Sequence, residues 1–131
     1  MVIVDSTVWI DFLAARANPE TLFVKKEFAG RKIGLADLIL CEVLQGLRDE
    51  APFERIRQLL TVLPVLDTGG AELAVASARN YRILRAKGIT VRKTIDCLIA
   101  TFCIEHRHSL LHNDRDYDPF EEHLGLRVVH P

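Results

Sequence analysis

The sequence predicts a single α/β domain, spanning residues 1–131, in which helices cover both faces of a mostly parallel, five-stranded sheet. Val2-Ile3-Val4 is an unbroken β-branched run, which is typical of a strand buried on both faces. Similar short apolar runs alternate with helical patterns along the chain, and parallel strands joined in this way need right-handed helical crossovers. The 131 residues, 49% of them hydrophobic, are enough for one core.

Each element has its own local signal. Ser6-Thr7 and Asp37 provide helix-start chemistry, Pro19 suits a first helical turn, and Gly88 stops a long helix. The predicted strands are residues 2–4, 33–36, 64–66, 109–112 and 126–129. The predicted helices are residues 8–15, a segment between Asn18 and Gly30, 37–47, a segment that begins at Asp49 or Glu50 and includes Leu60, 71–87, 94–106 and 119–124.

Composition narrows the class of protein. The net charge is −1, so any affinity for nucleic acid must come from a local basic patch or a bound cation. No apolar run approaches the ~20 residues of a membrane span and no signal segment opens the chain, so we expect a cytoplasmic protein with no membrane contact. Cys41, Cys97 and Cys103 form no C-x-x-C pair, and we expect them to be small buried hydrophobes.

Five acidic residues need explanation. Asp5 ends the first strand, where ligands bind in open α/β sheets, although an Asp there is often only a helix cap. Glu42 lies on a mostly apolar helix face, so its carboxylate needs a salt bridge, another cation or a strong donor. Asp96 lies in a first helical turn, where an acid also stabilises the helix end. Asp114 and Asp116 follow the fourth strand and alone would be turn residues.

Together these acids favour a metal site. The strand ends and helix starts of a parallel sheet converge on one edge, so Asp5, Glu42, Asp96 and Asp114 are expected to be neighbours. Two unit charges ~4 Å apart cost about 4 kcal/mol at an effective dielectric constant of 20, so protonation or a divalent cation must neutralise them. Oxygen ligands select Mg²⁺ or Mn²⁺. The residues therefore predict metal-assisted phosphodiester hydrolysis.

Four motifs follow one another along the chain: Val-Asp-Ser-Thr-Val-Trp-Ile-Asp (4–11), Glu-Val-Leu-Gln-Gly (42–46), Thr-Ile-Asp-Cys-Leu-Ile-Ala (94–100) and Leu-Leu-His-Asn-Asp-Arg-Asp-Tyr (110–117). In this order they resemble a known family, the PIN domain of VapC-type toxins, over essentially the whole chain. Each motif is weak alone, but the ordered set is specific. Asn113 stands where Thr is more usual and Tyr117 replaces the common Phe, and neither change removes a carboxylate.

The resemblance implies a PIN-like three-layer fold and specific roles. Asp5, Glu42, Asp96 and Asp114 match the family's catalytic acids, and Asp116 matches an additional acid that is often present. The implied metal ligands are Asp5, Asp96, Asp114 and Asp116. Either Ser6 or Thr7 matches the hydroxyl that orients the first Asp. The implied activity is that of a Mg²⁺-dependent endoribonuclease, with Mn²⁺ as a substitute, that forms a homodimer and is inhibited by a VapB-type antitoxin.

Further contacts are open to two interpretations each. Trp9 and Phe12 are either core residues or an edge that receives the antitoxin. Arg92, Lys93 and Arg115 are either solvated or in contact with RNA phosphates. His106, His108 and His112 alternate with apolar residues, but their spacing does not favour a zinc site.

Other functions fit the sequence less well. The same nuclease site could serve RNA maturation or cleave structured DNA. A signalling receiver would use Asp67 as phosphoacceptor, but it lacks paired acids after the first strand and leaves Glu42 and Asp96 without a role. A haloacid-dehalogenase-like phosphatase needs an acid at the position of Thr7. A purely binding PIN domain is disfavoured because all four acids are present.

Overall fold

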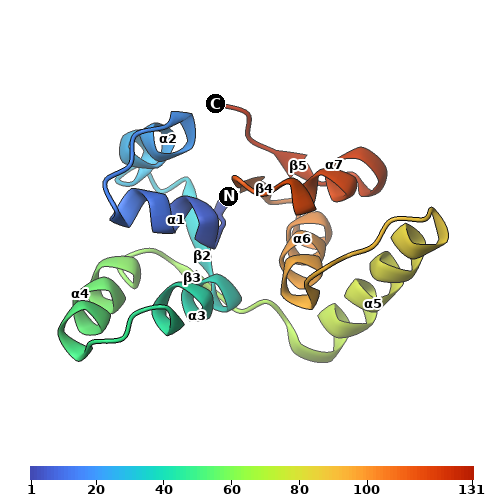
Figure 1. Ribbon diagram of the computed structural model, residues 1–131, viewed down its shortest axis with the longest axis horizontal. Coiled ribbons are helices and arrows are strands. Elements are labelled where there is room, and N and C mark those ends of the chain that lie inside the picture. The colour runs from blue at the N-terminus through green and yellow to red at the C-terminus, as the bar shows by residue number, and fades with distance from the viewer.

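The central strand of the sheet is β1 (Val2–Val4), and every pair of neighbouring strands is parallel. The computed structural model describes residues 1–131, and its strand order is β3-β2-β1-β4-β5 (Figure 1). All five predicted strands are present, and the sheet is entirely rather than mostly parallel. The other strands are β2 (Ile33–Ala36), β3 (Val65–Leu66), β4 (Ser109–Leu111) and β5 (Arg127–Val128).

Seven α-helices connect the strands, with α1–α4 on one side of the sheet and α5–α7 on the other (Figure 1). This division follows from the crossovers, because the chain moves outward from β1 to β3, returns to β4 and then continues to β5. The helices are α1 (Ser6–Leu13), α2 (Pro19–Glu27), α3 (Asp37–Gln45), α4 (Glu50–Leu60), α5 (Gly70–Ala86), α6 (Thr94–His106) and α7 (Asp118–Leu124).

Helix boundaries differ from the predictions mostly by one or two residues. The first helix begins at Ser6 because Asp5, not the Ser6-Thr7 pair, is its N-cap. Asn18 and Thr21 form a reciprocal capping box at the start of α2. A 3₁₀ turn, Arg115–Tyr117, precedes α7 and was not predicted. No helix in the chain is both long and apolar enough to cross a membrane.

The core decides one open interpretation, that of Trp9, and corrects one expectation, that of Cys41. Trp9 is fully buried and packs edge-to-face against Phe12 and Phe28, with centroids 5.8 and 6.3 Å apart, so it offers no exposed edge to an antitoxin. Cys41 is exposed, whereas Cys97 and Cys103 are buried as expected. Cys41 lies on the solvent side of α3, because Ile39 and Val43, one turn apart, form its buried face.

Candidate functional site

Asp5 is fixed at the carboxyl end of β1 by three hydrogen bonds. Its Oδ2 accepts from the backbone N–H of Thr7 (3.1 Å) and from the Thr7 hydroxyl (2.7 Å), and its Oδ1 accepts from the Tyr117 hydroxyl (2.8 Å). The Thr7 oxygen also accepts from the backbone N–H of Asn113 (3.2 Å), which follows β4. Of the two hydroxyls proposed to orient Asp5, the structure therefore places Thr7 on the carboxylate.

Tyr117 links two of the acids and was missed as a functional residue by the sequence analysis. Its ring is fully buried, and its hydroxyl lies 2.8 Å from Oδ1 of Asp5 and 3.4 Å from Oδ1 of Asp96. Burial and the charges of Asp5 and Asp96 raise the pKa of Tyr117 far above its usual value, so the hydroxyl stays protonated and donates. One feature of the sequence could have indicated this role: Tyr117 carries a hydroxyl at a position where the family commonly has Phe.

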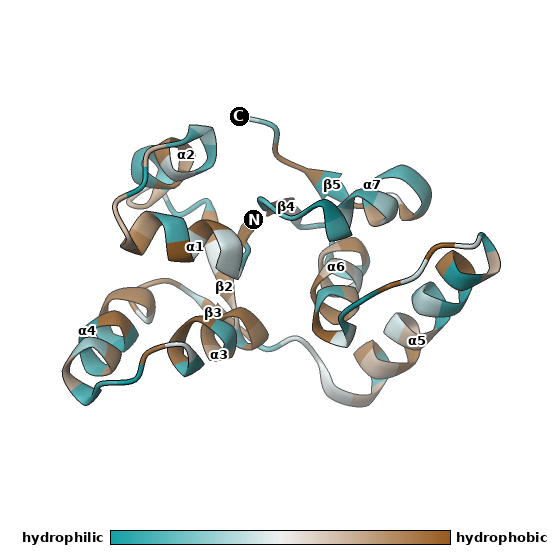
Figure 2. Cartoon of the chain, in the orientation of Figure 1, coloured by the Kyte–Doolittle hydropathy of each residue, from teal (hydrophilic) through white to brown (hydrophobic).

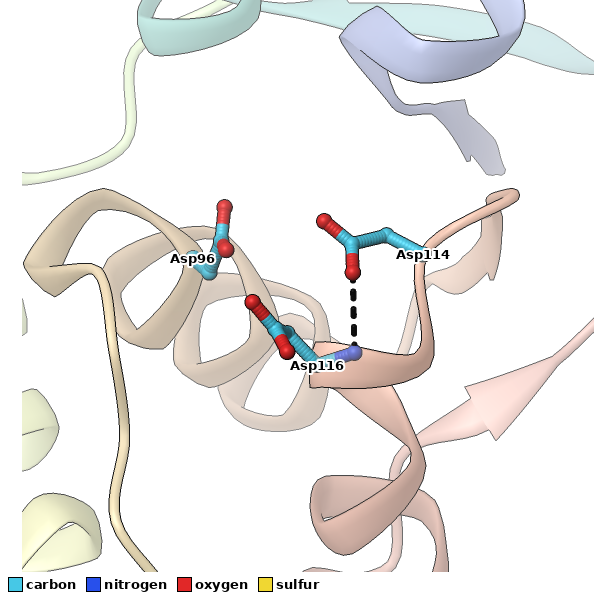
Figure 3. Close-up of side chains that lie close together, drawn as sticks. All are labelled: Asp96, Asp114 and Asp116. Carbon is cyan, nitrogen blue, oxygen red and sulfur yellow. Dashed lines mark hydrogen bonds between the residues drawn. The ribbon is translucent and has the colours of Figure 1, made fainter.

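Asp96, Asp114 and Asp116 form a group of converging carboxylates (Figure 3). One carboxylate oxygen from each residue lies within 4.8 Å of the others. Asp96 comes from the first turn of α6, whereas Asp114 and Asp116 come from the segment between β4 and α7. Asp114 caps the 3₁₀ turn by accepting from the backbone N–H of Asp116 at 2.9 Å. The fold thus brings together three of the four predicted metal ligands.

Asp96 is held in an environment that disfavours its negative charge. The residue is 5% exposed, and its Oδ2 is buried without any hydrogen-bond donor. Burial first, and then the charges of Asp5 and Asp114, raise the pKa of Asp96 to about 6, although Lys93 and the Tyr117 hydroxyl act in the opposite direction. A buried carboxylate oxygen without a donor needs a proton or a cation.

Glu42 extends the acidic site from the other side of the sheet edge. It lies beyond the middle of α3, rather than in the N-terminal half that was expected, and its Oε1 is buried without a donor. Burial and the charges of Asp5 and Asp96 raise the pKa of Glu42 to about 7. No Lys or Arg forms a salt bridge with it, which excludes the structural salt bridge considered from the sequence.

The donor set fits a hard divalent cation. Every converging group is a carboxylate oxygen, and one of these three residues, Asp96, keeps a buried oxygen without a partner in the protein. Asp5 is not part of the converging group. Hydrogen bonds engage both of its oxygens. It lies beside the group and reaches Asp96 through the shared Tyr117 hydroxyl.

Comparison with known proteins assigns this arrangement to a family. Residues 2–122 match the PIN domain family. The chain is 30% identical over 131 residues to VapC ribonuclease Mb1587 of Mycobacterium bovis and to Ribonuclease VapC11 of Mycobacterium tuberculosis, with 98% of each chain covered. The chain belongs to the VapC family of PIN-domain ribonucleases. This confirms the family, the fold and the nuclease class that the ordered motifs indicated, and it excludes the receiver and phosphatase alternatives.

Solved structures share the fold of this PIN domain. VapBC2 from Rickettsia felis, bound to a fragment of its promoter DNA, has a TM-score of 0.78 at 16% identity, with 98% of both chains covered. FitAcB from Neisseria gonorrhoeae also has a TM-score of 0.78 at 16% identity, covering 100% of this chain and 98% of that one. A toxin–antitoxin complex from Klebsiella pneumoniae has a TM-score of 0.73 at 18% identity, with the same coverage.

The other predicted site residues of this PIN domain lie outside the converging group of carboxylates. Arg92, Lys93 and Arg115 are all exposed, and of these only Lys93 lowers the pKa values of both Glu42 and Asp96. Ser6 is buried next to Asp5 but makes no hydrogen bond to it.

The histidines do not form a zinc site. Nδ1 of His112 accepts from the backbone N–H of Asp114 (3.1 Å), whereas Nδ1 of His108 faces the amino terminus (3.3 Å). The chain's one group of potential metal ligands is the acidic one.

Proposed function

We propose that this VapC-family chain hydrolyses RNA phosphodiester bonds with Mg²⁺, for which Mn²⁺ substitutes, bound at the acidic edge of the sheet. The observation that carries the proposal is the convergence of Asp96, Asp114 and Asp116, with Oδ2 of Asp96 buried and without a donor. A bound cation would neutralise the charge on the phosphate oxygens and lower the pKa of the water that it binds. The absence of any protein cation paired with these acids supports the same conclusion.

Each acid has a role that follows from its surroundings. Asp96, Asp114 and Asp116 hold the cation, and Asp5, fixed by Thr7 and Tyr117, completes the ligand set when RNA is bound.

Glu42 orients the attacking water and accepts its proton through Oε1, which has no competing donor. Oxygen from water adds to phosphorus and the bond from phosphorus to O3′ breaks. The departing O3′ takes a proton from solvent, so the products carry a 5′-phosphate and a 3′-hydroxyl.

RNA cleavage by the purified chain tests this proposal. Wild type should cleave in Mg²⁺ or Mn²⁺ and stop in EDTA, and Asp114→Asn should be inactive. Asp67→Asn is the matched control, because Asp67 is an exposed acid that follows β3 and lies outside the cluster. Full activity in EDTA, or products with 2′,3′-cyclic phosphate ends, would contradict the proposal.

We propose further that an antitoxin inhibits this site, because the similar structures include toxin–antitoxin complexes. A groove of about 320 Å³ between α1 and α2 suits a partner segment, and it contains the half-buried ring of Phe12, exposed Leu22 and the cations Arg16 and Lys25. A partner's Arg next to the acids would replace the metal by bidentate pairing. Antitoxin affinity should then fall as Mg²⁺ rises, and expression of the chain alone should arrest growth. Equal affinity with and without Mg²⁺ would contradict this mode of inhibition.

We also propose that the chain forms a homodimer and acts in the cytoplasm. Exposed Val62 and Val65 lie at edge strand β3, where a second copy can cover apolar surface. Sedimentation of wild type and of Val62→Asp measures this, and a monomeric wild type would exclude the dimer.

A further inference from the structure

The positive charge of this chain is concentrated in one segment. Residues 73–95 contain six of the seventeen Lys and Arg residues and none of the eighteen Asp and Glu residues. These six side chains are exposed, and none takes part in a salt bridge. They are Arg79, Arg82, Arg85, Lys87, Arg92 and Lys93. A chain whose net charge is −1 therefore carries a strong local concentration of positive charge along α5 and the connection to α6.

This basic segment leads to the acidic site. Helix α5 lies beside α6, the helix that carries Asp96, and the connection after α5 returns to the start of α6 (Figure 1). The last turns of α5 alternate between hydrophilic and hydrophobic residues, and the stretch just before α6 is hydrophilic (Figure 2). The connection ends at Lys93, which is close enough to lower the pKa values of Glu42 and Asp96. The basic segment therefore ends close to the acidic site.

Between α5 and α6 lies a groove of about 510 Å³ with a mixed lining. Tyr81, Arg82 and Arg85 contribute to it from one face of α5, and the guanidinium of Arg85 lies over the Tyr81 ring, 5.7 Å from its centroid. Apolar atoms of Ala78 and Leu98 line the groove between these polar groups. We call this surface the α5–α6 groove.

We propose that the α5–α6 groove binds single-stranded RNA beside the phosphodiester bond that is cleaved. Arginines attract and position phosphates, and an aromatic ring next to apolar atoms accepts an unstacked base. Tyr81 with Arg82 and Arg85 provides both features in one groove, and Lys93 connects it to the acids. A second copy of the chain would bring like charges face to face, which disfavours it as the occupant. The inference rests on the proposed function and identifies where its substrate lies.

Binding of a fluorescein-labelled 12-nucleotide RNA in EDTA tests the groove without cleavage. Arg82→Ala/Arg85→Ala should weaken binding about tenfold and reduce the slope of log K against log salt by about 1.4, because each phosphate contact on a single strand contributes about 0.7. The matched control Lys26→Ala/Arg55→Ala removes the same charge from exposed, unpaired positions on α2 and α4 and should bind like wild type.

Tyr81 provides a second test, which depends on its ring rather than its charge. Tyr81→Phe should bind like wild type, whereas Tyr81→Leu should lose about fivefold or more, since stacking on an aromatic ring stabilises a bound base by about 1–3 kcal/mol. Sedimentation of each variant should show an unchanged oligomeric state.

Three results would overturn the inference: no measurable RNA binding by wild type at low salt, equal loss in the α5 and control double variants, or loss of self-association without loss of RNA affinity. The last result would identify the groove as an interface between copies. Failure of the proposed function is separate, because it would show as bound but uncleaved RNA in Mg²⁺.

Discussion

Asp5 and Asp37 occupy equivalent places in the sheet but have different surroundings. Each follows a buried parallel strand, and each accepts a hydrogen bond from a threonine hydroxyl, Thr7 for Asp5 (2.7 Å) and Thr68 for Asp37 (2.8 Å). Asp37 also accepts from the backbone N–H of Leu38, and it joins the start of α3 to the segment after β3. Asp5, by contrast, reaches Asp96 through a shared hydroxyl.

The difference shows that a strand-end carboxylate becomes a candidate site through its neighbours. Asp37 is satisfied by local donors and has a structural role. Asp5 belongs to a set of acids in which Asp96 and Glu42 each keep a buried oxygen without a donor. Such unpaired oxygens are expected where a cation binds and are costly elsewhere.

The largest expected effect separates these two residues. Asp5→Ala should reduce Mg²⁺-dependent RNA cleavage by about 10²-fold or more, because it removes a carboxylate from the site. Asp37→Ala should keep the activity but lower the free energy of unfolding by about 1–2 kcal/mol through the lost hydrogen bonds. RNA cleavage assays measure the activity of both variants, and urea unfolding measures their stability. An Asp37→Ala variant that is inactive but as stable as wild type would contradict the structural role given to Asp37.

Removing only the Tyr117 hydroxyl tests whether the link between Asp5 and Asp96 distinguishes Asp5 from Asp37. Tyr117→Phe keeps the buried ring but frees one oxygen of Asp5 and removes the link to Asp96. Because partners of ligand residues typically change metal affinity 10–100-fold, we expect Mn²⁺ to bind about tenfold more weakly. Calorimetric titration measures this. Unchanged Mn²⁺ affinity would show that the hydroxyl does not position the acids.

A smaller effect is expected on thermal stability. Asp96→Asn removes a buried charge, so the metal-free variant should melt about 2–6 °C above wild type, a range that corresponds to about 1 kcal/mol for a chain of this size. Added Mg²⁺ should stabilise wild type more than the variant. If the variant melts lower and responds equally to Mg²⁺, Asp96 serves only to stabilise the start of α6.

The smallest expected effect is a pH dependence of stability. Between its ordinary pKa of 4.5 and the folded-state value of about 7, Glu42 binds more protons in the native protein than in the unfolded chain. Asp96 behaves in the same way between 3.8 and about 6. The metal-free protein should therefore lose stability as pH rises from about 4 to 7, and saturating Mg²⁺ should reduce the loss. Melting temperatures across this range, with Glu42→Gln as control, measure it.

The sequence was sufficient to predict which acids lie at this edge of the sheet, because their place follows from where strands end and helices begin along the chain. Asp5 and Asp114 were predicted because each follows a buried strand, and Asp96 because it lies in a first helical turn at the same edge. Their geometry then follows from the parallel topology.

Details that depend on tertiary packing could not be predicted. The Tyr117 hydroxyl matters because the 3₁₀ turn directs it between two acids that are distant in the chain. Burial of Trp9 and exposure of Cys41 depend on how α1 and α3 rotate against the sheet. Of the basic residues between positions 73 and 95, the sequence analysis named only Arg92 and Lys93 as possible RNA contacts. The arginines of α5 were missed because the overall charge is close to zero.

Binding of Mn²⁺, followed by electron paramagnetic resonance, tests most directly whether the acids at this edge form a metal site. Wild type and Asp37→Asn should bind Mn²⁺ saturably, and Asp96→Asn should lose this binding. Absence of saturable binding to wild type, or equal binding to all three proteins, would contradict the account.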